Sequence, residues 1–420
     1  MKNSSAISDA HGRIKRLLMA LPKYDEGTAH IISLLADLVR KLPHYTHFEL
    51  FTYDDELTQE VVEKILKREL ADYFFYSDHM FDKEELVKHA DKKCCIIKNP
   101  HGYNFSIWVQ DPFIVIQEEE YGGRGVILLE PHDEICGSND DEIPNTFEEL
   151  ALYEAKNIPL SFHGGNTLVA DDFMLVGAFH FNESKKIIAE KLDINDDEKL
   201  ERITKYHFTH HFGKALKIIP VGNDLNCKNK PQDAPSSEPF PHIDLYISLA
   251  GRAKNGKYQL LVGKPVAVLT KDEPLAESMR DCIVPIVENL EAQGFQIIRN
   301  PMPLTRTKVE KGNTYYCFYN NALIEIDGES KRIWMPTFGH GAWEKHLRKY
   351  DIENREIWHK LGFEVSELID FHPFVQDKAG VRCVTKYMGR TSIYHSHCEQ
   401  ETQKTNSKSP KASMKFQISI

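Results

Sequence analysis

The sequence lacks the features that define several large classes of protein. No window approaches the roughly 20 apolar residues that a membrane-spanning helix requires, and residues 1–10 contain no apolar stretch of signal-peptide length. No run of basic residues precedes the C-terminal tail, and the net charge is -11, which argues against a surface that neutralises phosphate. We therefore expect a cytoplasmic protein with no membrane partner and no nucleic-acid partner.

Cysteine is also sparse, with eight residues in 420. The eight include the adjacent Cys94 and Cys95, which cannot bridge easily, and their spacing is not that of a secreted disulfide scaffold. We expect a reducing compartment and free thiols.

The length and composition are those of a protein with a sizeable core. At 420 residues and 41% hydrophobic content, the chain is long enough for one large domain or two ordinary ones. Residues 399–420 are polar and predict a disordered C-terminal tail. We expect residues 1–398 to form a single catalytic domain.

Short apolar runs alternate with amphipathic stretches along the chain. Leu17 to Leu21 predicts a strand and Thr28 to Leu42 a helix, followed by a strand at Phe48 to Thr52 and a helix from about Leu57 to Leu70. Similar units recur at 125–129, 173–176 with a helix after 183, 218–220, 245–248, 283–294, and 333–335 with a helix from 342. The alternation predicts an α/β fold, and its recurrence suggests pseudo-repeats.

Four short segments carry residues suited to catalysis: Trp108 to Phe113, His163 to Asn166, His242 to Asp244, and Val381 to Thr385. In the first, Pro112 biases Asp111 toward an extended conformation, which predicts an aspartate presented rigidly at a strand end. In the second, the paired glycines permit a close backbone approach before a strand at 167–170. An ordinary tight turn is the alternative for this segment.

The other two segments contain a possible acid–base group and a possible nucleophile. His242 and Asp244 are two residues apart at the start of an apolar run, so on a strand they would share one face and could touch one ligand. An exposed polar pair is the alternative. Cys383 follows Gly380 near the end of the chain, whereas the other seven cysteines are expected to be small buried hydrophobes.

Taken in this order, the segments resemble the guanidino-group-modifying enzymes of the pentein superfamily, which include arginine, agmatine and peptidylarginine deiminases, dimethylarginine hydrolase and the amidinotransferases. Arg382 to Thr385 is similar to the cysteine segment of arginine deiminases. Tyr319 to Leu323 and Trp334 to Gly339 are similar to a stretch of agmatine and peptidylarginine deiminases. The resemblance runs from about Leu17 to Arg390. It implies a five-bladed α/β propeller of ββαβ-type repeats, with the site on its central axis.

The residues in these segments suit the deimination of an arginine-type guanidinium. Asp111 and Asp244 could hold the planar cation by paired, charge-assisted hydrogen bonds. Cys383 could add to the central carbon and expel ammonia, leaving a covalent thiouronium that water hydrolyses to a ureido product. His242 could transfer the protons in both steps. No metal and no organic cofactor is required. Trp108, His163 and Asn166 are expected to contact the substrate.

One residue departs from the family pattern. Arginine deiminases and their nearer relatives carry an acid immediately before the Gly-Gly pair, where this chain has His163. Either another acid such as Asp171 or Asp172 compensates, or the substrate is contacted differently, or activity is reduced. A neutral His163 could still orient His242 by a hydrogen bond.

Three alternatives to hydrolysis stay open. An amidinotransferase would use the same cysteine, histidine and aspartates but pass the amidino group to an amine. A hydrolytically impaired pentein could act by binding, as the ribosome anti-association factors of this fold do. Zinc binding by Cys383 with His395, His397 and Cys398 is a third possibility, although the spacing lacks the cysteine pairing of structural zinc sites.

The sequence restricts the substrate to an arginine-type guanidine, either a small molecule or an arginine within a protein. Arg382 could bind a substrate carboxylate, as expected of enzymes that act on free arginine. Gln110 and the Trp334 to Gly339 stretch instead resemble enzymes whose substrates lack that carboxylate. The proline-rich insertion from Asn223 to Pro241 predicts a loop near the entrance of the site. The oligomeric state stays open.

Overall fold

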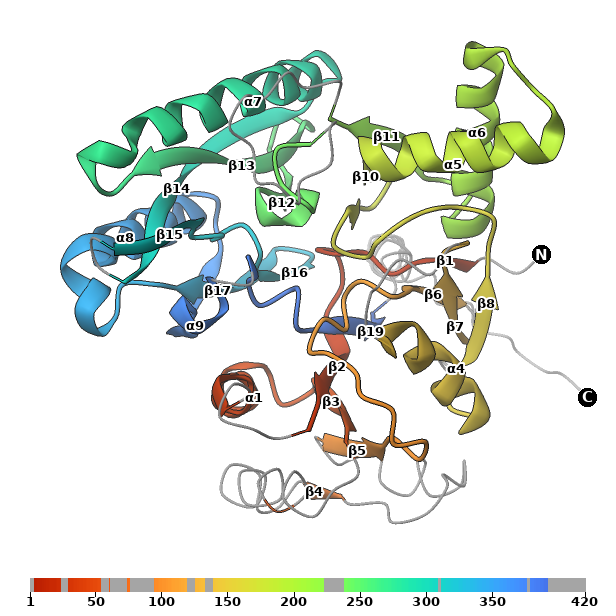
Figure 1. Ribbon diagram of the computed structural model, residues 1–420, viewed down its shortest axis with the longest axis horizontal. Helices are drawn as coiled ribbons and strands as arrows, with labels where there is room; N and C mark the ends of the chain where they lie inside the picture. Colours follow the sequence, from red (N-terminus) through yellow and green to blue (C-terminus); the bar gives the residue numbers. More distant parts are fainter. Residues whose placement is uncertain are drawn as a thin grey trace, which may run out of the picture.

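The computed structural model describes residues 4–23, 29–53, 60, 74–75, 94–118, 125–132, 139–222, 238–308, 311–375 and 378–391. Within these residues the strands form five sheets, which surround the middle of the molecule in Figure 1. Helices cover the outer sides of the sheets (Figure 1). The predicted α/β class is confirmed.

All five sheets share one pairing order. An inner strand pairs antiparallel with a second strand, and the second strand pairs parallel with a third. The five triplets, with the inner strand first, are β6 (Ile114–Glu118), β7 (Val126–Glu130) and β8 (Glu154–Asn157); β9 (Thr167–Val169), β10 (Phe173–Gly177) and β11 (Lys217–Val221); β12 (Ile247–Arg252), β13 (Tyr258–Ala267) and β14 (Gln296–Lys308); β16 (Leu323–Asp327), β17 (Ser330–Thr337) and β18 (Glu364–Asp370); and β19 (Lys386–Arg390), β2 (Ile14–Leu21) and β3 (His47–Thr52).

A helical connection joins the second and third strands of every triplet. The connecting helices are α4 (Glu142–Glu149), α5 (Ala178–Leu192) with α6 (Asp197–Phe212), α7 (Glu273–Ala292), α8 (Glu344–Lys360) and α1 (Ala29–Lys41). Four further strands extend the sheets at their edges: β1 (Ser4–Ala6), β4 (Phe74–Phe75), β5 (Cys94–Lys98) and β15 (Lys311–Tyr316). The pseudo-repeats suggested by the sequence correspond to this repeated order of strand, strand, helix and strand.

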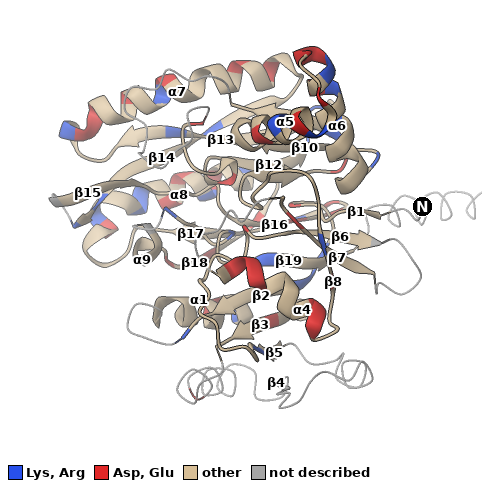
Figure 2. Ribbon diagram, turned by 45° about the vertical axis from the view of Figure 1, so that its right-hand side comes forward, with Lys and Arg blue, Asp and Glu red and all other residues tan. Residues whose placement is uncertain are grey.

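The first and last triplet strands of the described chain lie in the same sheet. Strand β19 pairs antiparallel with β2, and β2 pairs parallel with β3. Figure 2 shows basic positions on β19 in the interior, beside β2; these positions are Lys386 and Arg390, and both side chains are buried. Buried cations at an inner strand require nearby acceptors, and both residues donate to backbone carbonyls.

Local sequence patterns explain several element boundaries. In α1 the apolar residues Ile31, Leu34, Leu35 and Leu38 recur at helical spacing and are all buried. Helix α6 begins where the Asp196 side chain accepts a hydrogen bond of 2.9 Å from the backbone N–H of Lys199. The predicted helix over 28–42 and the strands over 17–21, 48–52, 125–129, 173–176, 218–220 and 333–335 all match observed elements.

Other expectations were wrong in detail. Ile107 to Val109, expected as a strand, is irregular, and Asp111 lies in a turn before β6. Ile243–Leu245 forms a 3-10 helix before β12 rather than a strand. The helix expected after 183 begins at Ala178, and 283–294 lies mostly within α7. The predicted helix at 57–70, most of the 223–241 loop and the 399–420 tail fall outside the described residues.

Two further expectations concern membranes and thiols. Within the described part of the chain, no helix combines the length and apolarity needed to cross a bilayer.

Cys94, Cys95, Cys317 and Cys383 are free thiols, but Cys282 is disulfide-bonded. The expectation of free thiols throughout is therefore wrong for Cys282.

Asp351 of α8 joins the two stretches that resemble agmatine and peptidylarginine deiminases. Its Oδ1 accepts hydrogen bonds from the Tyr319 hydroxyl at 2.6 Å and from the backbone N–H of Phe338 at 3.0 Å. Its Oδ2 accepts from the N–H of Gly339 at 2.9 Å. Asp351 is fully buried, so its loss would leave these donors without acceptors inside the core.

We expect Asp351→Ala to lower the free energy of unfolding by about 3 kcal/mol, because three buried donors lose their acceptor. Glu353→Ala, an exposed change on the same helix, should stay within about 0.5 kcal/mol of the wild type. Urea denaturation followed by circular dichroism measures both. Equal stability of the two variants would contradict the assigned role.

Candidate active site

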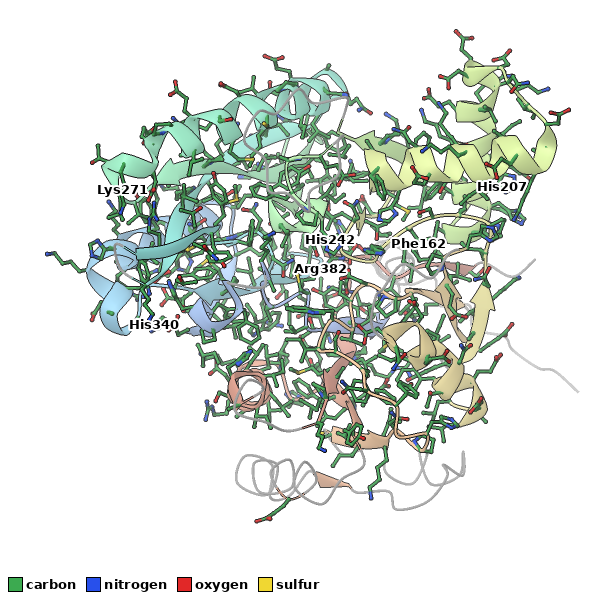
Figure 3. All side chains as sticks on the ribbon, in the orientation of Figure 1. Phe162, His207, His242, Lys271, His340 and Arg382 are labelled. Atoms are coloured by element: carbon green, nitrogen blue, oxygen red, sulfur yellow. The ribbon has the colours of Figure 1, made fainter. Side chains whose placement is uncertain are left out.

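The four predicted segments occupy equivalent places in four of the sheets. Asp111 precedes β6, Asn166 precedes β9, Asp244 precedes β12 and Cys383 precedes β19. In the fifth sheet, Asn321 precedes β16. All of these loops therefore lie at the same end of their inner strands. Figure 3 shows His242 and Arg382, from two of these loops, close together in the middle of the molecule.

Hydrogen bonds from these loops, or from the strands that follow them, connect the five sheets in a circuit. Each bond joins one sheet to the next: Gly165 N to Asp111 Oδ1 at 2.9 Å, Asp244 N to Gly165 O at 3.2 Å, Ser248 Oγ to Asn320 O at 2.7 Å, Arg382 N to Asn321 Oδ1 at 2.8 Å, and Lys386 Nζ to Gln110 O at 2.7 Å. The last bond returns to the loop that holds Asp111, so each loop is fixed by its neighbours.

The Gly-Gly pair allows two of these loops to touch. A Cβ atom on Gly164 would lie 1.8 Å from the Gln110 carbonyl oxygen. On Gly165 it would lie 2.6 Å from His242 Nδ1 and 2.8 Å from Asp111 Oδ1. All three distances are shorter than any van der Waals contact, so the predicted close approach is confirmed. Neither position has room for a side chain.

His163 and His242 are joined directly. His163 Nδ1 lies 3.1 Å from His242 Nε2, and His242 Nδ1 lies 3.8 Å from Asp111 Oδ1. Burial lowers the pKa of His163 to about 4, so this imidazole is neutral at pH 7. A neutral ring can share one hydrogen bond with His242, which is the geometry expected if His163 orients His242.

Asp244 belongs to a buried ion-pair network that the sequence did not indicate. Arg382 donates from one guanidinium nitrogen to Asp244 Oδ2 at 2.9 Å and from the other to Asp9 Oδ1 at 2.5 Å. Burial raises the pKa of Asp244 to about 7, an effect that the Arg382 charge opposes. Within the described residues, Asp244 Oδ1 is buried without a hydrogen-bond partner. This oxygen is therefore available to a ligand.

The ion pairs of this network engage both terminal guanidinium nitrogens of Arg382. Its two terminal guanidinium nitrogens already donate to carboxylates, and the residue is 4% exposed. Within the described residues its Nε–H is buried without a hydrogen-bond partner, and each terminal nitrogen carries two N–H groups. Binding of a substrate carboxylate by Arg382 therefore stays a prediction, although its two printed ion pairs are with Asp9 and Asp244.

The Cys383 thiol is held at the centre of these residues. Asn321 Oδ1 accepts hydrogen bonds from the backbone N–H groups of Arg382 and Cys383, at 2.8 and 3.1 Å. Burial, and then the nearby carboxylates of Asp244 and Asp111, raise the pKa of the Cys383 thiol. The thiol is 5% exposed and is the neutral form at pH 7. It therefore requires activation before it can act as a nucleophile.

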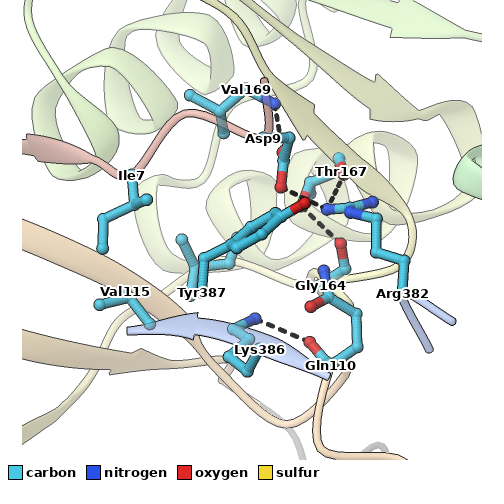
Figure 4. Close-up of a pocket in the computed structure, with 11 residues that line it drawn as sticks. Ile7, Asp9, Gln110, Val115, Gly164, Thr167, Val169, Arg382, Lys386 and Tyr387 are labelled. Carbon is cyan, nitrogen blue, oxygen red and sulfur yellow. Dashed lines mark hydrogen bonds and ion pairs between the residues drawn. The ribbon is translucent and has the colours of Figure 1, made fainter. Parts of the chain in front are cut away.

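Lys386 is a second residue that the sequence did not single out. Its buried ammonium donates to the carbonyl oxygens of Gln110 and Phe113, on either side of Asp111 and Pro112. Burial lowers the pKa of Lys386 to about 7. Figure 4 shows Lys386 pointing at Gln110, and Arg382 on the same small cavity. The cavity measures about 20 Å³, enough for about one water molecule and too small for a guanidinium.

Two predicted substrate-binding residues lie behind the site. Asn166 is fully buried, and its amide accepts from Ile243 N at 3.0 Å and donates to Glu238 at 3.2 Å. It therefore supports the loop of His242 and Asp244. Trp108 is half-buried and packs against the largest core cluster.

The acids proposed to compensate for His163 are elsewhere. Asp171 and Asp172 lie in the turn at the far end of β9, where both form ion pairs with Arg252. They are therefore separated from His163 by the length of the strand.

Asp111, His163 and His242 could in principle hold a metal ion, since each offers a ligand atom within 4.8 Å of the others. The shortest approaches, however, use both ring nitrogens of His242, with Nε2 toward His163 and Nδ1 toward Asp111. The two nitrogens of one imidazole point away from each other and cannot bind the same ion. In the described structure His163 and His242 share a hydrogen bond, whereas Asp111 lies only within ion-pair distance of His242.

Solved structures with the same fold include an agmatine deiminase from Enterococcus faecalis, with a TM-score of 0.57, 10% identity, and 93% of this chain and 97% of that chain covered. An agmatine deiminase from C. jejuni matches with a TM-score of 0.52 and 14% identity, over 92% and 97% of the two chains. A candidate arginine deiminase from Porphyromonas gingivalis matches with a TM-score of 0.55 and 14% identity, over 91% and 97%.

This chain has the fold of these solved structures. The resemblance to the pentein superfamily, drawn from four short segments, is confirmed by these structures at the level of the fold. No protein-family model and no curated protein matches the sequence. At 10–14% identity, a shared pentein fold leaves the activity to be argued from the site.

The buried thiol leads to a prediction about its reactivity. We expect alkylation of Cys383 by iodoacetamide to be slow at pH 7 and to keep rising beyond about pH 10, where an ordinary thiol with a pKa of about 8.5 has levelled off, because a raised pKa reduces the thiolate population at any given pH. Mass spectrometry of the Cys383 peptide measures the rate.

The same chain unfolded in urea is the control for this experiment, and its Cys383 should react as an ordinary thiol. A plateau for the folded protein at or below about pH 8.5 would show that the thiol is already activated without substrate.

Proposed function

We propose that this pentein hydrolyses a guanidinium group by covalent catalysis, releasing ammonia and a ureido product. The observation that carries the proposal is the presence of two buried carboxylates, Asp111 and Asp244, within electrostatic reach of one thiol, Cys383. Two carboxylates beside a neutral thiol create a place for a cation, and a bound cation would favour the ionised form of Asp244. A planar guanidinium supplies that cation, together with N–H donors for both carboxylates.

Binding of the substrate would also activate the nucleophile. In the free protein, burial and the two carboxylates disfavour the Cys383 thiolate. A guanidinium held by Asp111 and Asp244 neutralises their charge and places a positive carbon against the sulfur. Both changes lower the thiol pKa, so the thiolate forms where it is needed.

The reaction then runs in two balanced stages. His242 accepts the Cys383 proton, the sulfur bonds to the guanidinium carbon, and the proton passes to the leaving nitrogen, which departs as ammonia. In the second stage His242 takes a proton from water, whose oxygen bonds to the thiouronium carbon. The carbon–sulfur bond breaks and the proton on His242 restores the thiol. The second water proton is released as the carbonyl forms and is taken up by ammonia as ammonium. His163 holds the His242 ring through both stages by the Nδ1–Nε2 hydrogen bond.

The substrate that fits best has no free α-carboxylate. Arg382 is committed to Asp9 and Asp244, so we favour a decarboxylated arginine or an arginine within a peptide over free arginine. We also propose that the five sheets close into a propeller formed by residues 1–398, with the site on its axis. The circuit of hydrogen bonds between the five sheets supports that closure.

The direct test measures ammonia and ureido product from a panel of agmatine, free arginine, methylated arginines and an arginine-containing peptide. We expect release from a substrate without a free carboxylate. Cys383→Ala should abolish it, with a loss of at least about 10³-fold, because no other described thiol lies beside both carboxylates.

Two results would refute this proposal. If the wild type forms no ammonia and no ureido product from any member of the panel, the protein does not hydrolyse these guanidines. If Cys383→Ala forms both products at the wild-type rate, the thiol has no part in the mechanism. Formation of a new guanidine when an amine is added would identify amidino transfer instead.

His163 allows a second test. His163→Phe keeps a ring of similar size but cannot hydrogen-bond to His242, so we expect kcat to fall by about 10²-fold with a smaller change in KM. His163→Gln, which retains a hydrogen-bonding group, should recover part of the loss. The control is His207→Phe on α6, which should leave both constants unchanged. A kcat unaffected by His163→Phe would exclude the positioning role.

A further inference from the structure

A large cavity lies at the end of the sheets opposite the candidate active site. Its volume is about 940 Å³, within the range of small-molecule sites in proteins. The cavity is lined by the β9–β10 turn at Asp171, the β12–β13 turn at Arg252 to Lys254, the β16–β17 turn at Asp327 to Lys331, and the α8–β18 connection at Lys360 to Gly362. We call it the turn-end cavity.

The two ends of the same strands therefore carry different sets of candidate functional residues. Asn166, Asp244 and Asn321 precede β9, β12 and β16, whereas the turn-end cavity is built from residues at or after the ends of those strands. None of the proposed catalytic residues lines it. A ligand in this cavity would be distinct from the guanidine substrate.

The charges around the cavity are only partly neutralised. Arg252 forms ion pairs with Asp171 and Asp172, and Asp327 pairs with Arg13. Within the described residues, the three lysines of the lining have no ion-pair partner; they are Lys254, Lys331 and Lys360. Glu329 is the remaining lining acid, and it is exposed. The three lysines therefore outnumber this one acid, whose charge opposes the fall in the Lys331 pKa.

Lys331 is the lysine with the strongest need for a counter-ion. It is half-buried, its ammonium lies 5.3 Å from the Phe363 ring centroid, and its closest acceptor is the Leu361 carbonyl oxygen at 3.4 Å. Burial lowers the pKa of Lys331. An anion placed against it would offset that loss of solvation.

The rest of the lining suits an organic ligand. Ile326, Ala253 and Leu361 supply apolar surface between the lysines. His11 supplies a neutral polar group; its Nε2 lies 2.9 Å from the Tyr258 hydroxyl, and burial lowers its pKa to about 4. A carbon framework could contact the apolar residues while its anionic groups reach the lysines.

We propose that the turn-end cavity binds a small organic anion carrying at least two oxyanion groups, phosphate or carboxylate, held by Lys254, Lys331 and Lys360. Three lysines from three separate elements, the β12–β13 turn, the start of β17 and the end of α8, match such a ligand better than a single charge. The proposal is independent of the proposed catalytic function.

Pyrophosphate and citrate are the probes that represent the two classes of oxyanion. Isothermal titration calorimetry and thermal unfolding of the full chain would be compared at equal ionic strength, set with sodium chloride. We expect binding at millimolar concentration or below, and a Tm that rises with the concentration of the probe. Preference for one probe would identify the class of oxyanion.

The decisive variant is Lys254→Gln/Lys331→Gln/Lys360→Gln. It should weaken binding by at least about tenfold, a loss of 1.4 kcal/mol. The matched control is Lys199→Gln/Lys214→Gln/Lys217→Gln, which removes the same charge from exposed lysines outside the cavity and should bind as the wild type does. Ala253→Trp fills the cavity without changing its charge and should also weaken binding.

Each of three results would overturn the proposal. One is the absence of binding by the wild type at millimolar probe. Another is equal weakening in the two lysine variants, which would indicate diffuse surface attraction. The last is unchanged binding by Ala253→Trp, which would place the anion outside the cavity.

Discussion

The buried guanidinium of Arg382 is the constraint around which the candidate site is assembled. It lies between Asp9, from the N-terminal segment, and Asp244, from the loop before β12, and its backbone N–H is held by Asn321. Removing one partner of such a pair leaves an uncompensated buried charge, which typically costs 3–5 kcal/mol. Cys383 is the next residue in the chain, so the position of the thiol is set by the same contacts.

The sequence was informative where local pattern determines structure. Apolar spacing located α1 and most of the buried strands, and the Gly-Gly pair correctly indicated a close backbone approach. Local pattern failed at His242 to Asp244, where alternation typical of a strand occurs in a 3-10 helix. There the Asn166 side chain and the Gly165 carbonyl accept the backbone hydrogen bonds of Ile243 and Asp244, and tertiary contacts override the pattern.

The residues that the sequence did not reveal act over long separations. Asp9 lies 373 positions from Arg382, Asn321 lies 62 positions from Cys383, and Lys386 lies 276 positions from Gln110. Asn321 lies within the Tyr319 to Leu323 stretch and Lys386 directly follows the Val381 to Thr385 segment, but an aspartate, an asparagine or a lysine is unremarkable in isolation. Their roles depend on which loops the sheets bring together, and one sequence contains no signal for that pairing. The ion pairs of Asp171 and Asp172 with Arg252 could not be predicted from the sequence for the same reason.

The pairing of β19 with β2 has a consequence for synthesis of the chain. The strand that follows Cys383 completes a sheet begun by residues 14–21, so the two halves of this sheet are among the first and last described residues to be made. A nascent chain that ends before Cys383 can contain Asp111, His163, His242 and Asp244, yet its first sheet lacks its inner strand. Contacts of such high sequence separation form late because a long loop must close first. The nucleophile is therefore the last member of the site to arrive, and a truncated translation product would carry the carboxylates without the thiol.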